Sequence, residues 1–309
     1  MSLPSIIFCG SGEFGLPTLR ALIESGHKIV HVFTQPDRPA GRGRKLTPTP
    51  IGQFAIDRNL TLTRTADINA EPLTPADVVV VIAFGQKIAE HVTTHARLGA
   101  LNLHGSRLPK FRGAAPVQAA ILAGESVTGN SIIRLAPKMD AGAVLGMSEI
   151  PIGELETAGE LHDRLAADGA PLMLRVLEEL ATGRAVEVEQ DHSRATLARK
   201  LSRDSARIDW TRPAVEIARQ IRGLYPWPAC HVRIMEGDRT LARATLVRAR
   251  PVLLSEHAAP GTITTEGRVS TNNSAVEVVE LQPEGGRVMS LSDFRNGHPW
   301  KPGSRVESI

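Results

Sequence analysis

The sequence predicts an α/β protein in which an open, mostly parallel sheet is followed by a small C-terminal β-barrel. In the first half, apolar stretches of strand length alternate with stretches whose apolar residues recur at helical spacing. This alternation is typical of strand–helix–strand units, which build a parallel sheet with helices on both sides, so we expect a Rossmann-like domain. Past Trp227 the pattern changes to short β-type runs at close intervals, which predicts an OB-like barrel.

The composition places the chain among soluble globular proteins. Its 309 residues are 42% hydrophobic and 22% charged, unlike disordered or fibrous chains. A net charge of +3 with a pI of about 9.1 permits a polyanionic partner without requiring one. Cys9 and Cys230 lie far apart, which favours a reducing compartment over a disulfide framework. We see neither a secretory signal nor a run of the roughly 20 apolar residues that a membrane helix needs. We therefore expect a cytoplasmic protein without membrane association and, because no long amphipathic surface is left over, a monomer.

The elements of the first domain follow from their residue patterns. The run 78–83 is apolar throughout, as expected of a strand that is covered on both faces. Residues 16–24 have apolar side chains at helical spacing. The longest helical pattern spans 157–182, and we expect it to break or bend near Gly169 and Pro171. Further strands are expected at 5–9, 28–34, 60–64, 100–104 and 131–135, and further helices at 51–59 and 116–123.

The second half begins with a polar segment of mixed charge, 186–206, which is typical of a linker. Thr211 is a candidate N-cap for a helix over 213–224 that has a proline early in its first turn. Short strands are expected at 230–235, 241–248, 261–264, 276–282 and 287–290. These patterns predict a Rossmann-like domain over residues 1–188, a linker over 189–206 and an OB-like barrel over 207–309.

Residues 10–15, GSGEFG, have the glycine spacing of a dinucleotide-binding turn after the first strand. Asp37 lies roughly where the ribose-binding acid of such a site is expected, about 20 residues further on. However, Asp37 belongs to a long loop that is rich in proline, glycine and basic residues, not to the tight end of a strand. We therefore interpret GSGEFG as a structural strand-to-helix turn and expect no nicotinamide cofactor.

The basic loop that follows carries four cations, which alternate with proline and glycine: Arg38, Arg42, Arg44 and Lys45. Because proline and glycine disfavour regular elements, we expect an irregular surface segment that displays its cations. Such a segment can follow a phosphate backbone, with binding that depends on salt. A solvated loop without a partner is the alternative interpretation.

Asn102 and His104 occupy alternate positions of the expected strand 100–104, so their side chains share one face of the sheet. They come at the carboxyl end of the strand, where open α/β sheets bind ligands. Asp140 follows the next strand in a KMDAG turn, which can bring a carboxylate back toward the imidazole. An amide, an imidazole and a carboxylate that converge suit acyl transfer, because N–H groups stabilise an oxyanion and the carboxylate orients the imidazole or accepts a proton. A buried structural histidine and an ordinary turn aspartate are the alternatives.

Three groups of residues together resemble the formyltransferases that use 10-formyltetrahydrofolate. They are Asn102-x-His104-Gly105-Ser106, the following Leu108-Pro109-x-x-Arg112-Gly113-x-x-Pro116, and Met139-Asp140-x-Gly142. Within this family, QPDRPAGRGRKL at 35–46 is similar to the loop of the members that act on methionyl-initiator tRNA. Motifs of the last third, at 206–210, 226–228 and 260–261, also match that family, so the resemblance covers nearly the whole chain.

The resemblance implies transfer of the formyl group of 10-formyltetrahydrofolate, a co-substrate, to the free α-amino group of methionyl-initiator tRNA. The transfer would pass through a tetrahedral intermediate, without a covalent enzyme adduct and without a metal. Asn102 and His104 would bind the developing oxyanion, and Asp140 would pair with His104 and help to remove the amine proton. The residues implied to contact folate are Ser106, Arg107, Leu108, Pro109, Phe84, Gly85 and Gln86.

For the tRNA, the resemblance implies that the basic loop, with Arg38, Arg42, Arg44 and Lys45, lies at the acceptor stem. Phe14 would lie near the amino-acid end. The barrel would supply a second basic surface through Arg219, Arg222, Arg233 and Arg243. The sequence departs from the family pattern in three places. GSGEFG lacks a usual proline, and Arg107 stands where leucine is usual. Ala136-Pro137-Lys138 precedes Met139, where a glycine is common just before the methionine.

Several other activities remain as alternatives. Sugar-nucleotide N-formyltransferases also have the Asn-x-His and Asp core and a small second domain, but they are not expected to have PDRPAGRGRK. Glycinamide ribonucleotide formyltransferases resemble only the first domain, and a formate-releasing hydrolase would use water in place of the amine. A nicotinamide oxidoreductase rests on GSGEFG alone, and a non-catalytic RNA-binding protein leaves Asn102, His104 and Asp140 without a role.

Overall fold

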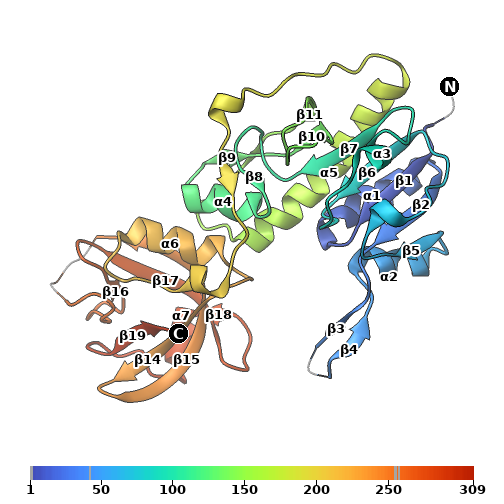
Figure 1. Ribbon diagram of the computed structural model, residues 1–309. Coiled ribbons are helices and arrows are strands. Elements are labelled where there is room, and N and C mark those ends of the chain that lie inside the picture. The colour runs from blue at the N-terminus through green and yellow to red at the C-terminus, as the bar shows by residue number, and fades with distance from the viewer. Residues whose placement is uncertain (1–2, 42, 254–255, 257) are drawn as a thin grey trace. The chain divides into compact units, whose positions relative to one another are not determined.

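The computed structural model describes residues 3–41, 43–253, 256 and 258–309 (Figure 1). These residues pack into two compact units. The first reaches up to Pro116 and adds Thr128–Ile150 and His162–Leu197, and the second is formed by Val117–Val127, Pro151–Leu161 and Ala198–Ile309. The chain therefore contributes to the second unit from three separate segments. The domain boundaries expected at 188 and 207 stay predictions.

The first unit is built on a seven-stranded sheet whose strand order is β11-β10-β7-β6-β1-β2-β5. Its strands are β1 (Ile6–Gly10), β2 (Ile29–Thr34), β5 (Leu62–Arg64), β6 (Val78–Ile82), β7 (Ala100–His104), β10 (Ser131–Arg134) and β11 (Val144–Met147). The pairs β1–β2, β1–β6, β6–β7 and β2–β5 are parallel, which confirms the expected mostly parallel sheet. The strand expected at 131–135 is present, but β10 runs antiparallel to β7, and β11 runs antiparallel to β10.

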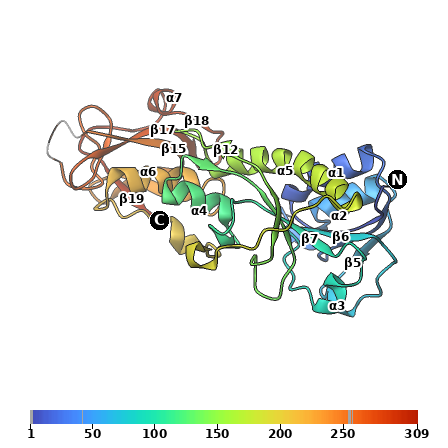
Figure 2. The same cartoon turned by 90° about the horizontal axis from the view of Figure 1, so that it is seen from above.

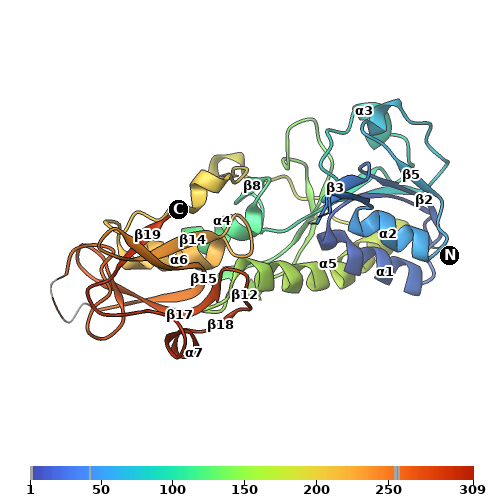
Figure 3. The same cartoon turned by 90° about the horizontal axis from the view of Figure 1, so that it is seen from below.

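Helices lie on both sides of this sheet (Figures 2 and 3). On one side are α1 (Leu16–Glu24), α2 (Pro50–Asp57) and the part of α5 (Ala158–Ala181) that belongs to the first unit, and on the other is α3 (Glu90–Thr93). The five residues of β6 are all buried, as expected of a strand covered on both faces. On the α3 side, Val92 packs in one core cluster with Ile7, Cys9 and Val79.

The helix α5 is continuous over 24 residues, with Pro171 inside it, so a break near Gly169 and Pro171 is wrong, and a bend there stays a prediction. Gly169 has a packing role instead. A Cβ at this position would lie 2.5 Å from Cδ2 of Leu103 in β7, so the missing side chain lets α5 approach the sheet. Because side chains alternate along a strand, Leu103 faces α5, and its neighbours Asn102 and His104 face the opposite side.

The basic loop contains a two-stranded antiparallel ribbon, so the expectation of an irregular segment is wrong. The strands β3 (Arg38–Ala40) and β4 (Lys45–Thr47) pair in register around a turn. The glycine residue Gly41 and Arg44 have positive φ angles of 69° and 47° and lie in that turn, not in the strands. Glycine therefore shapes the turn of the ribbon and does not prevent the pairing. Arg42 lies outside the described residues.

The second unit contains a six-stranded antiparallel sheet, which confirms the expected barrel-like fold. Its path is β16-β17-β15-β14-β19, and β18 pairs with β17. Isolated bridges join Thr262 to Arg305 and Ile263 to Val269, so the sheet is nearly closed and residues 261–264 form bridges in place of the expected strand. The strands are β14 (Cys230–Glu236), β15 (Arg239–Val252), β16 (Val269–Ser270), β17 (Ala275–Pro283), β18 (Met289–Ser290) and β19 (Arg305–Ser308).

The helix α6 (Ala214–Gly223) packs on this sheet through a buried face, and α7 (Leu291–Arg295) is a short helix that the sequence did not predict. Thr211 is not the N-cap of α6, because the helix starts after Pro213. The Thr211 hydroxyl instead donates to the Asp209 carboxylate, which also accepts from the Thr211 N–H. Other elements of the described residues include α4 (Pro116–Ala123) and the short strands β8 (Arg112–Gly113), β9 (Val127–Thr128), β12 (Ile150–Pro151) and β13 (Leu197–Ala198).

The contact between Gly169 and Leu103 yields a stability prediction. Overpacking of a well-filled core costs about 1–3 kcal/mol, whereas replacing a helical glycine by alanine gains about 1 kcal/mol. Since the new methyl group meets the buried Leu103 side chain, we expect Gly169→Ala to lower the free energy of unfolding by about 1 kcal/mol. Urea denaturation followed by circular dichroism measures this change.

The matched control is the same substitution in a Leu103→Ala background. There the new methyl group has room, so Gly169→Ala is expected to be neutral or stabilising. A single Gly169→Ala variant that is as stable as the parent protein would show that Gly169 is not needed for the approach of α5.

Candidate active site

Asn102 and His104 lie on the same face at the carboxyl end of β7, as the alternation of the strand predicts. Asn102 pairs across the sheet with Val81 of β6 and with Ile133 of β10. The site therefore lies where the carboxyl ends of two parallel strands, β6 and β7, are adjacent. Asn102 is half-buried, and its carboxamide has no hydrogen-bond partner among the described residues. It is available to a ligand.

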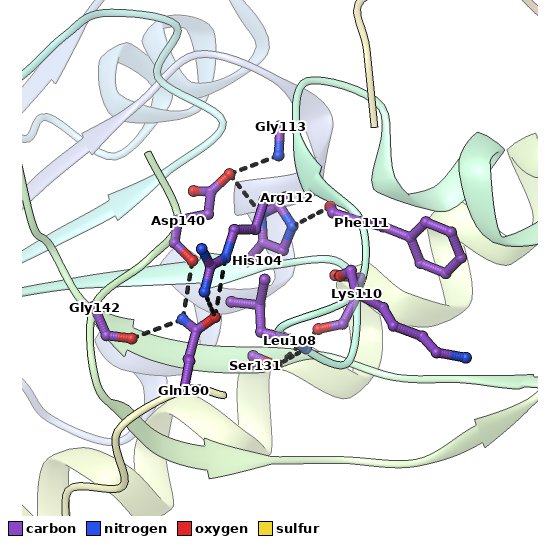
Figure 4. Close-up of polar contacts among 11 residues, drawn as sticks. His104, Leu108, Lys110, Phe111, Arg112, Gly113, Ser131, Asp140, Gly142 and Gln190 are labelled. Carbon is purple, nitrogen blue, oxygen red and sulfur yellow. Dashed lines mark hydrogen bonds and ion pairs between the residues drawn. The ribbon is translucent and has the colours of Figure 1, made fainter. Parts of the chain in front are cut away.

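His104 is 6% exposed, and both of its ring nitrogens face polar groups (Figure 4). Nε2 lies 2.9 Å from the Phe111 carbonyl oxygen. Because a carbonyl oxygen only accepts hydrogen bonds, Nε2 carries a proton and donates it there. Nδ1 lies 3.7 Å from Oδ2 of Asp140, beyond hydrogen-bond length but within the range of an ion pair. In the neutral imidazole the free lone pair is thus on Nδ1, next to the carboxylate.

Asp140 reaches His104 by a loop that folds back over the sheet. Because β10 runs antiparallel, it begins opposite His104 and ends opposite Leu101, so its following loop starts away from the site. Asp140 has a φ of 51°, in the left-handed region that aspartate tolerates better than most residues. A Cβ on Gly142 would lie 1.9 Å from the carbonyl oxygen of Arg134, so only glycine allows the loop to pack this closely on the strand.

The Asp140 carboxylate is held in place by a backbone group. Its Oδ2 accepts a hydrogen bond of 2.8 Å from the Gly113 N–H, and the side chain keeps 15% of its surface exposed. The residues 111–113 therefore contact both members of the pair, His104 through the Phe111 carbonyl and Asp140 through the Gly113 N–H (Figure 4). His104 and Asp140 are thus brought together, and Asn102 shares the sheet face of His104; the catalytic roles expected of the three residues stay predictions.

Two buried polar residues lie beside this pair: Arg112, which the sequence offered only as part of the family motif, and Gln190, which it did not single out. Arg112 is 4% exposed, and its Nε and Nη2 both donate to Oε1 of Gln190, at 3.1 and 2.6 Å. The Gln190 amide in turn donates to the carbonyl oxygens of Asp140 and Gly142, at 2.9 and 2.7 Å. Gln190 was assigned to a linker because its segment is polar and has no regular pattern. A buried glutamine has no periodic signal, so only the family motif around Arg112 pointed here.

The turn after β7 carries four of the residues implied to contact folate, and two of these side chains have structural roles. The Ser106 hydroxyl donates to the Lys110 carbonyl oxygen, and Ser106 is fully buried. Leu108 is buried in a small cluster with Ile133 and Val144. Arg107 is exposed and forms an ion pair with Glu149, and Pro109 is half-buried.

The loop after β6 carries the other three. Phe84 is buried in the core, whereas Gly85 is exposed and has a φ of 77°. The Gln86 side chain accepts from the Ile68 N–H and donates to the Thr65 carbonyl oxygen, both at 2.8 Å. Gln86 therefore fixes the neighbouring loop. The backbone around Gly85 is the accessible part of this segment, and it follows the strand that pairs with β7.

The residues implied to contact tRNA lie on two elements of the first unit. Phe14 is buried in the turn between β1 and α1, with its ring 5.2 Å from that of His162. On the β3–β4 ribbon, Arg38, Arg44 and Lys45 are exposed, and within the described part of the chain neither Arg44 nor Lys45 has an ion pair. Arg38 donates to Gln35 at 3.4 Å. Arg42 belongs to the residues that the structure does not describe.

The four arginines expected on the barrel surface have different surroundings. Arg233 is paired with Glu307 at 2.8 Å, and Arg243 approaches Glu284 at 3.9 Å. The Arg222 guanidinium donates to the carbonyl oxygen of Glu156, and burial lowers its pKa. Arg219 lies over Gly124, where a Cβ would be 2.1 Å from its Cζ.

The structure does not favour covalent catalysis by cysteine. Cys9 and Cys230 are both free thiols buried in the cores of their units. Burial raises the pKa of the Cys9 thiol strongly and that of Cys230 to about 12, so neither forms a thiolate readily. Over the described ranges, no group of three His, Cys, Asp or Glu side chains is arranged to hold a metal ion. None of the described helices has the length and apolar character of a membrane span.

Comparison with known sequences agrees with this geometry. The family model described as "Formyl transferase" matches residues 5–177, and "Formyl transferase, C-terminal domain" matches residues 200–299. The protein named "Methionyl-tRNA formyltransferase" from Methylococcus capsulatus is 40% identical over 303 residues, which cover 95% of this chain and 96% of that protein. The protein of the same name from Pseudomonas fluorescens is 40% identical over 302 residues, 94% of this chain and 92% of that protein.

Solved structures share the fold at low sequence identity. An N-formyltransferase from Helicobacter canadensis, in complex with folinic acid and dTDP-3-aminofucose, has a TM-score of 0.64 at 14% identity, covering 88% of this chain and 97% of that one. HypX from Aquifex aeolicus in complex with tetrahydrofolic acid has a TM-score of 0.61 at 15% identity, covering 96% of this chain and 48% of that one. With the two family matches and the relatives that are 40% identical along nearly their whole length, this chain belongs to the methionyl-tRNA formyltransferase family.

Proposed function

We propose that this enzyme transfers the formyl group of 10-formyltetrahydrofolate to the α-amino group of methionyl-initiator tRNA. The observation that carries the proposal is the arrangement of a free Asn102 carboxamide and a His104–Asp140 pair at the carboxyl end of β7. The names of the nearly full-length relatives support the tRNA substrate. Formyl transfer to an amine needs a group that accepts the amine proton and donors that stabilise the oxyanion.

The first role falls to His104 with Asp140. When the amino nitrogen attacks the formyl carbon, it has to lose a proton, and the lone pair of His104 Nδ1 can receive it. The negative charge of Asp140, 3.7 Å away, stabilises the imidazolium that results. The Phe111 carbonyl fixes the ring orientation and the tautomer through Nε2. The proton is then available for the nitrogen that leaves when the carbon–nitrogen bond to the donor breaks.

The second role falls to Asn102 and to the protonated imidazole. The Asn102 carboxamide is free to donate to the oxygen that becomes an oxyanion as the carbon turns tetrahedral. Once Nδ1 carries a proton, His104 can donate to the same oxygen. Each donor of this kind stabilises the transition state by roughly 3–4 kcal/mol in acyl-transfer enzymes.

The loop after β6 presents an exposed backbone at the edge of the site. Exposed Ala83 and Gly85 have positive φ angles of 46° and 77°, which turn the backbone at the edge of the site. Phe84 and Gln86 anchor the loop from below and hold it in one conformation. The pterin end of the folate would bind against this backbone, next to Asn102, which pairs with Val81.

The β3–β4 ribbon supports tRNA as the acceptor over a sugar nucleotide. Its cations protrude on an ordered ribbon that follows β2, at the same carboxyl edge of the sheet as the site. A sugar nucleotide carries two phosphates, whereas a tRNA stem offers a continuous row of them. The ribbon matches the second arrangement.

The direct test is to supply the protein with 10-formyltetrahydrofolate and methionyl-initiator tRNA and to measure formyl-methionyl-tRNA. A dTDP-linked aminosugar in the same reaction serves as the competing acceptor. We expect formylation of the tRNA and none of the sugar. Formylation of the sugar without the tRNA would contradict the proposal and favour the alternative activity.

Asp140→Asn is expected to lower kcat by roughly two to three orders of magnitude, because it removes the charge that stabilises the His104 imidazolium. The amide keeps an oxygen for the Gly113 N–H and, like aspartate, tolerates the φ of 51°. Asn102→Ala is expected to have an effect of similar size through the lost oxyanion donor. Steady-state kinetics with both substrates at saturation measure both changes.

Asp77→Asn is the matched control. Asp77 precedes β6 at the opposite edge of the sheet, and hydrogen bonds from Ser5 hold the pKa of its carboxyl below the ordinary value. This variant is expected to lose stability and to keep its kcat. Equal kcat values for Asp77→Asn and Asp140→Asn would contradict a special role of Asp140.

Removing two cations from the ribbon, in Arg44→Ala/Lys45→Ala, is expected to raise the KM for tRNA by roughly tenfold and to leave the KM for 10-formyltetrahydrofolate unchanged. Each phosphate contact that is lost lowers the slope of log affinity against log salt by roughly 0.7–0.9. A salt series of the KM therefore separates phosphate contacts from a structural effect. Lys28→Ala, at the amino edge of the sheet, is the control and is expected to change neither KM. An equal rise of both KM values would show that the ribbon is structural.

A further inference from the structure

The structure assigns Gln190, with Arg112, as a positioning residue that holds the Asp140 loop against His104. This inference rests on the proposed function, since it concerns how the same site is built. The segment that carries Gln190 follows α5 and meets the sheet at the isolated bridge between Val188 and Val144 of β11. The Gln190 side chain bonds to both loops that meet at the His104–Asp140 pair (Figure 4).

Three sets of hydrogen bonds and the 3.7 Å ion pair between His104 and Asp140 form a closed ring. His104 bonds to the Phe111 carbonyl, and the next residue, Arg112, donates twice to Oε1 of Gln190. The Gln190 amide donates to the Asp140 carbonyl, and the Asp140 carboxylate returns to His104. In such a ring the distance between the imidazole and the carboxylate is fixed by their direct contact and also by the bonds that run through Arg112 and Gln190.

Gln190 holds the backbone of the Asp140 loop at two positions near the carboxylate. The Gly113 N–H bonds to the side chain, but the loop backbone is bonded to Gln190 at Asp140 and at Gly142. Asp140 is in the left-handed region, which most residues avoid and which the surroundings must therefore maintain. The two hydrogen bonds from the Gln190 amide nitrogen hold the backbone at Asp140 and at Gly142, on either side of Ala141, and so maintain this conformation.

Burial makes Arg112 depend on Gln190. Arg112 is 4% exposed, and within the described residues no carboxylate lies at ion-pair distance from it. A buried guanidinium needs acceptors, and the ones it has are Oε1 of Gln190 and Nδ1 of His192, the latter at 2.8 Å. Gln190 is itself only 7% exposed, and both ends of its amide are used. A residue with both polar ends committed in this way fixes the distance between its partners.

Gln190→Glu tests the bonds from Gln190 to the Asp140 loop separately from its bonds to Arg112. A glutamate keeps the acceptor for Arg112, but it loses the amide donors and places an oxygen against the carbonyl oxygens of Asp140 and Gly142. We expect kcat to fall at least tenfold while both KM values stay within twofold, because substrates still bind and only the His104–Asp140 geometry is lost. We also expect the amide protons of 138–142 to exchange at least tenfold faster.

Gln220→Glu is the matched control. Gln220 is equally buried, and its amide donates to the carbonyl oxygens of Ser205 and Arg207, at 2.9 and 3.0 Å, in the second unit. It is expected to lose a similar amount of stability without change in kcat or in the exchange of 138–142. Both variants are measured at a temperature where circular dichroism shows them folded.

Arg112→Lys tests the link from its other end if Gln190→Glu does not fold. Lysine keeps the buried positive charge but not the two-pronged bond to Gln190, so the same pattern of lower kcat, unchanged KM and faster exchange is expected. A kcat within twofold of the parent protein, or exchange of 138–142 that is unchanged, overturns the assignment. If the parent protein itself fails to formylate tRNA, the proposed function is wrong, and the exchange data still decide whether Gln190 holds the loop.

Discussion

The hydrogen bond from the Gly113 N–H to the Asp140 carboxylate joins two loops that leave the sheet at opposite edges. The loop after β7 begins beside His104, whereas the loop after β10 begins beside Leu101, because these neighbouring strands are antiparallel. Asp140 therefore has to cross the face of the sheet to approach the imidazole. The glycine at 142 makes this path possible, since its Cβ would overlap the Arg134 carbonyl. The chemistry of the site depends on that crossing.

The parallel part of the fold and the positions of Asn102 and His104 could be predicted from sequence because both follow local rules. Alternation along a strand places two polar side chains on one face, and buried parallel strands read as continuous apolar runs such as β6. The direction of β10 could not be predicted, because a strand of four residues has the same pattern in either direction. The approach of Asp140 was expected from its turn, but the route that the loop takes was not.

Other differences between the predicted and the observed structure also arise from contacts that local sequence patterns do not show. Gly169 and Pro171 predict a helix break when only local propensity is considered, yet the close contact with Leu103 makes the glycine useful inside a continuous helix. Thr211 has the right residue type for an N-cap, but its hydroxyl is bound to Asp209. Gln190 carries no pattern at all, since its importance comes from partners that lie 48 to 78 residues away. Long-range partners of a single polar side chain cannot be read from one sequence.

The β3–β4 ribbon has a consequence for how binding to this protein depends on salt concentration. Its strands are paired before any partner arrives, so binding does not have to order a free chain, which would cost about 1–2 kcal/mol for each residue. Beside Lys45, the apolar side chain of Leu46 is 66% exposed. A partner that covers Leu46 removes this apolar side chain from water, which is favourable. This gain in binding free energy persists when dissolved ions screen the cations. The ribbon thus combines an attraction that weakens in concentrated salt with one that does not.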